Sequence, residues 1–402
     1  MEITTTPGSP PPVDTAALIA DPYGTYAALR ESGPVHRVTG HDGRPAWLVT
    51  RYSDVREALA DPRLSLDKRN ALPGNYAGFP LPPALDANLL NMDPPDHTRI
   101  RRLVVKAFTP GRVEKLREPI RQLCEELLDA IEPQGRADLI ASYAGRVPVT
   151  VICDLLGVPK EDRHDFRAWT DALVAPDPAK PHLAKDAVGH MLRFYTGLID
   201  SKRAEPADDL LSDLVTVQEE GEAGLSGDEL TSLAFLILFA GYENVVHLIG
   251  NSVLALLERP HLMRELRDDP TAIPAAVEEF ARFDGPAPLA IRRFPLEDVE
   301  IGGVTVPAGE TVLLSIASAN RDPAHFPDPD RLDPRRDRSG NLWLGHGIHY
   351  CLGASLGRTE TEIALETLLR RLPGLALAVP HEELQWRPSM RARGLISLPV
   401  TW

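Results

Sequence analysis

The chain has 402 residues, a formal net charge of −15 and only three cysteines. A chain of this length can bury a large core, and length alone allows two or three domains. The acidic balance argues against general nucleic-acid binding, which depends on neutralising phosphates. Three cysteines offer no disulfide framework, so we expect a reducing, cytoplasmic setting in which Cys124 and Cys153 are buried as small apolar residues.

The N-terminal segment predicts neither a signal peptide nor a membrane anchor. Residues 1–12 are rich in Thr and Pro and lack a basic region followed by an apolar one. The longest uninterrupted apolar stretch, residues 233–241, is far shorter than a bilayer span. We therefore expect a soluble protein.

The first elements along the chain read as a hairpin, a helix and a loop. Residues 34–50 alternate apolar and polar side chains around a Gly-containing turn, which predicts a β-hairpin, and residues 52–60 predict a short helix. Residues 64–93 lack periodicity and are dense in Pro, Gly and Asn. They predict a long loop that is either functional or disordered.

Helical patterns follow. Residues 95–156 show a helical pattern that is broken once, around Pro133 and Gly135. A Pro/Ala-rich break then separates two further predicted helices, over residues 161–173 and 184–202.

The most distinctive predicted helix covers residues 226–258. Ser226 and Glu229 fit a capping box at its start, and at roughly 1.5 Å per residue it would cross a whole domain. Apolar side chains occupy every face over residues 233–239, which places the helix in the interior. Its middle nevertheless carries Glu243 and His247, and a buried carboxylate needs a partner or a role. Such local exceptions are typical of a functional site.

The last third mixes helix and short strands. We expect a helix over residues 262–282, strands within residues 299–306 and 311–316, and a Pro-rich coil over residues 320–338. A further helix is predicted over residues 354–369. The whole pattern is α-rich, without an alternating strand–helix array.

Between that coil and that helix lies a glycine-rich run, residues 342–353, with Cys351 near its end. Glycines let peptide N–H groups approach a sulfur closely. Those donors and the start of the following helix should lower the pKa of the Cys351 thiol and favour a metal-binding thiolate. A zinc site would need further paired ligands, and the chain has no second cysteine pair. A catalytic thiol stays open on these residues, whereas a purely structural cysteine does not require the flanking glycines.

The run resembles the haem-binding loop of the cytochrome P450 superfamily, Phe-Gly-x-Gly-x-His-x-Cys-x-Gly. The matching residues are Gly345, Gly347, His349, Cys351 and Gly353, while Leu344 replaces the family's Phe. The neighbouring Trp343 could supply the missing aromatic bulk against the sulfur.

This resemblance implies a mainly α fold with a small β region, the triangular cytochrome P450 fold. It further implies a single domain over residues 1–402, with haem b between the long central helix and the helix of the cysteine loop. Cys351 would bind the haem iron through its thiolate.

The resemblance extends to the central helix, where residues 240–244 are similar to the family's oxygen-binding stretch. Gly241 would open a groove for dioxygen and Glu243 would serve proton delivery. Asn244 stands where the family usually has Thr, and a carboxamide is a poor proton relay. Protons would then pass through water, a substrate hydroxyl or Glu243; alternatively, Asn244 anchors the water that Thr would have held.

Two charged groups complete the match. His97 and Arg101 resemble the family's propionate-binding pair, which Arg293 and His349 would join. Glu279 and Arg282, three residues apart on one helix face, resemble the family's Glu-x-x-Arg. Arg331 would complete that buried structural network.

Substrate contacts are expected by region only. Besides the loop over residues 64–93, the expected contacts are Phe235, Phe239, Ala240, Leu289, Ala290, Ile291, Met390 and Arg391. Their character implies a mostly apolar, medium-to-large ligand. For Arg391 a surface salt bridge is favoured over a substrate carboxylate.

The resemblance implies a cytoplasmic monooxygenase that inserts one oxygen atom from O2 into an apolar small molecule, by hydroxylation or epoxidation, in secondary metabolism. Ferredoxin and ferredoxin reductase would supply electrons, with docking at Arg102, Lys106 and Arg358, and neither nucleic acid nor membrane would be a partner. Asn244 keeps an alternative open, oxidative coupling, desaturation or peroxide-driven chemistry. A haem-thiolate binding protein without turnover is the third hypothesis.

Overall fold

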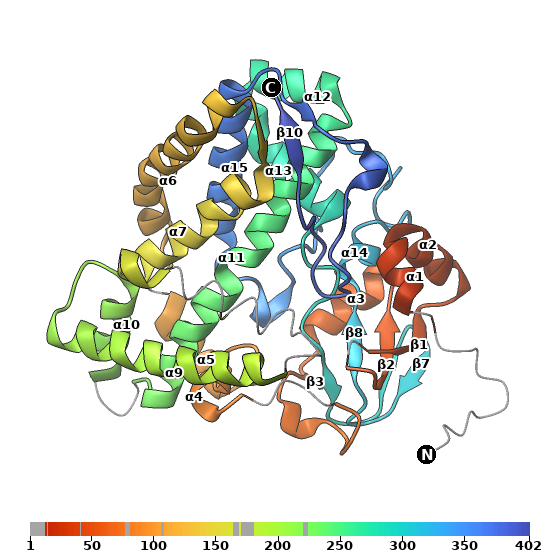
Figure 1. Cartoon of the computed structure of the whole chain (residues 1–402). Coiled ribbons are helices and arrows are strands. Elements are labelled where there is room, and N and C mark those ends of the chain that lie inside the picture. The colour runs from red at the N-terminus through yellow and green to blue at the C-terminus, as the bar shows by residue number, and fades with distance from the viewer. Residues whose placement is uncertain are drawn as a thin grey trace.

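The computed structural model describes residues 13, 15–40, 42–76, 81–105, 108–163, 169, 181–219 and 224–402. Its ribbon has a triangular outline, with one long helix, α11 (Gly227–Leu257), running through the interior (Figure 1). The other α-helices are α1 (Thr15–Ala20), α2 (Pro22–Ser32), α3 (Tyr52–Ala60), α4 (Pro83–Asp86), α5 (Asp96–Val105), α6 (Pro110–Ile131), α7 (Arg146–Leu155), α9 (Pro181–Ala204), α10 (Leu210–Glu219), α12 (Pro260–Asp268), α13 (Ile273–Asp284), α14 (Ile316–Ala319) and α15 (Ala354–Arg371).

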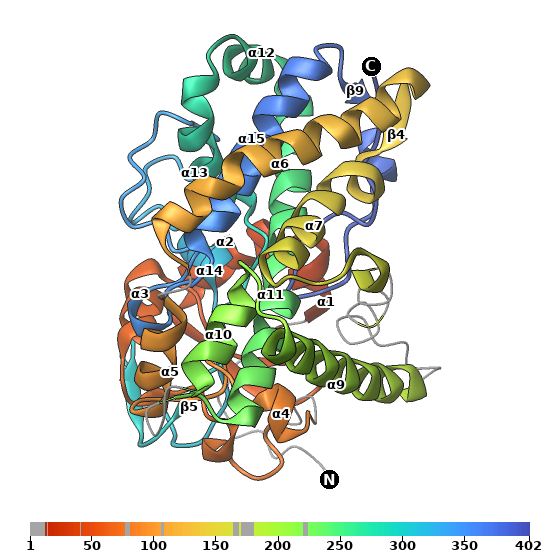
Figure 2. The ribbon, with the colours of Figure 1, turned by 90° about the vertical axis from the view of Figure 1, so that its left-hand side faces the viewer.

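Helix α11 confirms the predicted capping box. The Ser226 hydroxyl accepts from the Glu229 N–H at 3.1 Å, and the Glu229 carboxylate accepts from the Ser226 N–H at 2.8 Å. The helix packs against α4, α7, α13 and α15, and Figure 2 shows it between α7 and α15. It is long and apolar enough to cross a membrane, but 72% of its most apolar window is buried inside the protein, as expected of a core helix.

The small β region lies beside this helical body. Its strands are β1 (Val35–Thr39), β2 (Pro45–Val49), β3 (Leu64–Ser65), β4 (Arg136–Asp138), β5 (Phe294–Pro295), β6 (Val299–Ile301), β7 (Val304–Val306), β8 (Val312–Leu314), β9 (Ala376–Leu377) and β10 (Pro399–Thr401). The predicted hairpin is the antiparallel pair β1–β2, and β8 adds to β2 in parallel. Val312 of β8 forms an antiparallel bridge with Arg293, so this sheet fixes the segment that carries Arg293.

Several predicted boundaries were wrong. The predicted loop over residues 64–93 contains β3 and α4, and α4 packs on α11. The predicted helix over residues 262–282 is two helices, α12 and α13, separated by a short 3₁₀ turn that the Asp269 side chain caps. The helical pattern over residues 95–156 also contains β4, and α10 was not predicted. The predicted helix over residues 161–173 lies largely outside the described residues.

Candidate haem-binding and oxygen site

The cysteine loop takes its shape from two glycines. Gly345 and Gly347 have φ angles of +77° and +75°, a region that favours glycine. A side chain on Gly347 would also press on the end of α3, since its Cβ would lie 3.2 Å from the Leu59 carbonyl oxygen. The Cys351 N–H donates to the Leu344 carbonyl at 2.9 Å, and Gly353 stands at the N-cap of α15. Cys351 is therefore held on a short loop at the start of that helix.

The surroundings of the Cys351 thiol disfavour its charged form. The residue is exposed, yet the surrounding protein desolvates the sulfur, and this burial raises the pKa of the thiol. The Gly353 N–H and the charges of Arg101 and Arg358 lower that pKa but do not outweigh burial. The expectation that the loop donors and the start of α15 lower the pKa of this thiol was thus wrong for the protein residues alone, because burial outweighs them. A bound metal ion would supply the missing positive charge.

A cluster of cationic and imidazole groups lies near this loop. His97 on α5 is 1% exposed, and its ring lies 4.2 Å from that of His349. Desolvation, together with the charge of Arg101, lowers the pKa of His97 to about 4. Desolvation and the charges of His97, Arg293 and Arg101 lower the pKa of His349 to about 3. Arg293 is 3% exposed, and desolvation lowers its pKa to about 10.

This cluster fits an anionic ligand. Neither ring nitrogen of His97 has a hydrogen-bond partner among the described residues. Arg101 and Arg293 each donate to a backbone carbonyl, of Tyr350 and Ile291 respectively, and form no ion pair within the described chain. Buried donors without acidic partners suit carboxylates such as the two propionates of haem b. With Cys351, the residues present therefore fit this cofactor.

The middle of α11 is open on one face. Ala240 and Asn244 are exposed although most neighbouring residues of this helix are buried, and they lie one helical turn apart. Phe235 and Phe239 stack at 5.0 Å between ring centroids further along the helix. Phe235 is buried in the core, so of this pair only the half-buried Phe239 can contribute to the open face.

Gly241 has a packing reason of its own. A Cβ at this position would lie 2.9 Å from Cδ1 of Ile152 on α7, so glycine allows α7 to approach α11. The groove for dioxygen at Gly241 stays a prediction.

Of the predicted substrate contacts, Leu289, Ala290 and Ile291 are half-buried, and Met390 is buried in one apolar cluster with Leu289 packed against it. Arg391 is exposed and has no ion pair within the described chain. The expected surface salt bridge was wrong, because no carboxylate of a described residue reaches this side chain.

The buried network around Glu279 has a different third member from the one predicted. Arg282 donates to both carboxylate oxygens of Glu279, at 2.7 and 2.8 Å. The second arginine is Arg336, whose Nε lies 3.3 Å from Glu279, and not Arg331. The Arg331 side chain is 71% exposed and lies 3.6 Å from Asp333, while its backbone carbonyl accepts from Arg282 and Arg336.

The residues predicted to dock the electron donor differ in their ion pairing. Arg102 is exposed and has no ion pair among the described residues, whereas Arg358 pairs with Glu278 at 2.5 Å. Trp343 also binds Glu278, at 3.0 Å through its indole N–H, so its ring is tied to α13. Lys106 lies outside the described residues.

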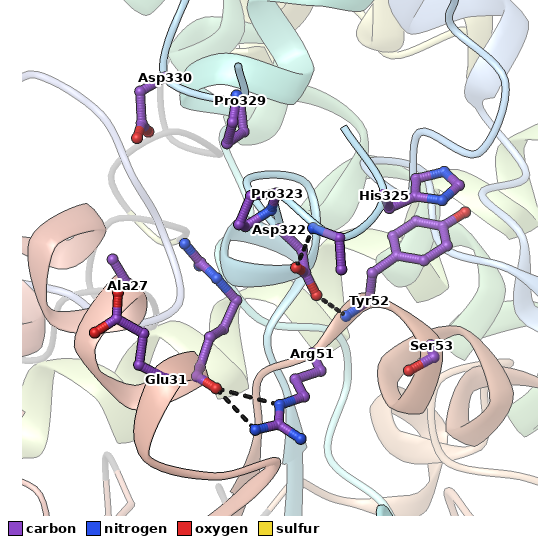
Figure 3. Close-up of a pocket in the computed structure, with 12 residues that line it drawn as sticks. Ala27, Glu31, Arg51, Tyr52, Ser53, Asp322, Pro323, His325, Pro329 and Asp330 are labelled. Atoms are coloured by element: carbon purple, nitrogen blue, oxygen red, sulfur yellow. Dashed lines mark hydrogen bonds between the residues drawn. The ribbon is translucent and has the colours of Figure 1, made fainter. Parts of the chain in front are cut away.

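A separate polar pocket of about 590 Å³ lies between α2, α3 and the segment that follows α14. Figure 3 shows Arg51 bonded to the Arg30 carbonyl and Asp322 bonded to the start of α3. None of the candidate haem or oxygen residues lines this pocket.

Comparison with known proteins identifies the family. The cytochrome P450 family model matches residues 182–374. The chain is 48% identical to the cytochrome P450 monooxygenase PikC of Streptomyces venezuelae, over 99% of this chain and 96% of that protein. It is 47% identical to the vitamin D(3) 25-hydroxylase of Pseudonocardia autotrophica, over 100% and 98%. The solved structure of PksS from Bacillus subtilis aligns with a TM-score of 0.90 and 38% identity, covering 97% of this chain and 99% of that one. The chain therefore belongs to the cytochrome P450 family of haem-thiolate monooxygenases.

Proposed function

We propose that this enzyme hydroxylates or epoxidises a polyketide-derived molecule in bacterial secondary metabolism. Relatives carry such activities in their names. They include the 6-deoxyerythronolide B hydroxylase of Saccharopolyspora erythraea, 42% identical, and the mycinamicin IV hydroxylase/epoxidase of Micromonospora griseorubida, 44% identical. The observation that carries the proposal is the open face of α11 at Ala240 and Asn244, with the half-buried Phe239 beside it. This surface suits a mostly apolar ligand of medium to large size.

In this proposal the protein residues have distinct roles. Cys351 binds the iron, and His97, Arg101, Arg293 and His349 hold the propionates. When bound, the haem supplies the activation of dioxygen. Glu243 passes protons toward the open face of α11, and Asn244 orders water there.

Electron supply and location follow the same proposal. A ferredoxin, reduced by its reductase, docks at the face that carries Arg102, in the cytoplasm. The whole chain acts as one domain.

The test is a spectral titration followed by product analysis. Macrolide aglycones, glycosylated macrolides and sterol-like compounds are added to the ferric enzyme, and the Soret band is monitored. We expect micromolar shifts with the polyketides, and oxygenated products by mass spectrometry with a surrogate redox chain. A shift and a product with the sterols alone would overturn the substrate class.

A further inference from the structure

A row of polar residues runs along one face of the core helix α11. Glu243, His247 and Asn251 are four residues apart and therefore share one face. His247 is 1% exposed, and neither of its ring nitrogens has a hydrogen-bond partner within the described chain. The Oδ1 atom of Asn251 is also buried without a partner there. Unpaired polar groups in a core are costly, so their presence needs a reason.

His247 and Arg387 approach the same oxygen of Glu243. The Nε2 atom of His247 and an Nη atom of Arg387 each lie 3.6 Å from Oε1 of Glu243. Arg387 lies in the turn between Trp386 and Leu395, and its N–H donates to the Gly394 carbonyl at 2.9 Å. Oε1 of Glu243 therefore lies between a basic group of its own helix and one of this turn.

Gly394 makes room for the imidazole. A Cβ at position 394 would lie 2.0 Å from Nδ1 of His247, so any other residue there would displace the ring. The ring is thus packed between α11 and the turn that carries Arg387. A site shaped so closely around an unpaired imidazole points to a role for its nitrogens.

The two basic groups differ in what they can do. Arginine stays protonated in proteins, so Arg387 can fix Glu243 but cannot give it a proton. Imidazole can both give and take a proton. Asn244 cannot replace the hydroxyl that the family usually has, because a carboxamide is a poor relay.

We propose that His247 positions Glu243 and supplies it with protons, an inference that rests on the proposed role of Glu243. The proton leaves Nε2 of the imidazolium and binds Oε1 of Glu243, which leaves a neutral imidazole and a neutral carboxyl group. The imidazole then recovers a proton from solvent. In this chain the pair Glu243 and His247 takes over proton delivery that the family shares between an acid and a threonine.

The test compares His247→Asn with Ser252→Ala. Asparagine keeps a polar side chain at the site but cannot carry a proton, and Ser252 is a buried residue of the same helix whose hydroxyl is equally unpaired. We expect His247→Asn to lower the product formed per reduced nicotinamide at least about tenfold, within the range for general acid catalysis. Turnover with hydrogen peroxide, which brings its own protons, should change less than about twofold. Ser252→Ala should leave both measurements near wild type.

A second measurement does not depend on activity. In the carbon monoxide-bound ferrous enzyme, labelled with ¹⁵N-histidine, Glu243→Gln should shift the ring signals of His247. The signals of His381, which pairs at the surface with Glu258, should not move. Unchanged His247 signals, or unchanged coupling in His247→Asn, would overturn the inference. Unchanged coupling in Glu243→Gln would instead overturn the proposed role of Glu243.

Discussion

Asn244 is the residue at which the chain departs from the family's oxygen-binding pattern. It is exposed on the open face of α11, so its side chain can contact water or ligand rather than the core. Its type and its place were both readable from the sequence. What the sequence could not show is that His247, one turn from Glu243, lacks any other described partner, because that depends on what surrounds the ring.

The substitution Asn244→Thr tests whether the carboxamide limits proton transfer. A hydroxyl group can donate and accept a hydrogen bond and can pass a proton on. We therefore expect the product formed per reduced nicotinamide to rise by about twofold or more, and by no more than general acid–base catalysis usually contributes. Product and nicotinamide consumption are measured in the same reaction. An unchanged ratio would mean that proton delivery does not pass through position 244.

Glu360 is a buried carboxyl group on α15, 1% exposed, and its Oε2 has no hydrogen-bond partner in the described part of the chain. Burial raises the pKa of this group well above its ordinary value of 4.5. The folded protein therefore keeps this proton to a higher pH than the unfolded chain does. The contribution of Glu360 to the free energy of unfolding is therefore fully present below about pH 4.5 and falls as the pH rises above that value.

We accordingly expect Glu360→Gln, which keeps the shape without the titration, to stabilise the enzyme at pH 8 and to have little effect at pH 4.5. Urea unfolding midpoints of the holoenzyme at the two pH values provide the measurement. Glu382→Gln, at an exposed position, removes the same charge and serves as the control. An equal effect of both variants at pH 8 would contradict the explanation by burial.

Whether a helix could be predicted from the sequence depended on whether local or tertiary contacts stabilise it. The start of α11 was predicted because Ser226 and Glu229 make their own local hydrogen bonds. Helix α4 was missed because four residues cannot form a stable helix alone, and its packing on α11 stabilises it. The break between α12 and α13 was present in the sequence as Asp269 before a proline, a signal of a helix end that was not used.

The Glu279 network shows the same division. Glu279 and Arg282 were predicted from their resemblance to the family's Glu-x-x-Arg, whose spacing of three places both residues on one helix face. The third member lies in coil, where no regular spacing predicts which way a side chain points. Arg331 and Arg336 could therefore not be distinguished from the sequence. The structure selects Arg336, which is 11% exposed at its side chain.

This assignment predicts unequal effects of two arginine substitutions. Arg336→Ala removes one partner of a buried carboxylate and should lower the free energy of unfolding by about 3 kcal/mol. Arg331→Ala removes an exposed side chain, and its backbone carbonyl still accepts from Arg282, so a loss of about 0.5 kcal/mol or less is expected. Chemical denaturation of both variants, with haem content as a second measure, decides between them. A larger loss for Arg331→Ala would restore the original prediction.

For the whole molecule, the net charge of −15 conceals a local exception. The face that carries Arg102 offers a cation without an ion pair among the described residues, whereas Arg358 is already neutralised by Glu278. An acidic electron donor is repelled by the whole protein at long range and attracted by this face at short range. Salt screens the first effect more than the second, because contacts closer than the Debye length of about 10 Å are screened less.

Charge reversal should therefore act locally. Arg102→Glu and Arg44→Glu change the net charge equally, but Arg44 lies in the turn between β1 and β2 and not on α5. We expect Arg102→Glu to raise the KM for ferredoxin about fivefold, as the loss of roughly 1 kcal/mol at a surface ion pair implies, and to leave peroxide-driven turnover unchanged. Arg44→Glu should change neither. Steady-state kinetics with varied ferredoxin provide the measurement, and equal effects of the two substitutions would show that only net charge matters.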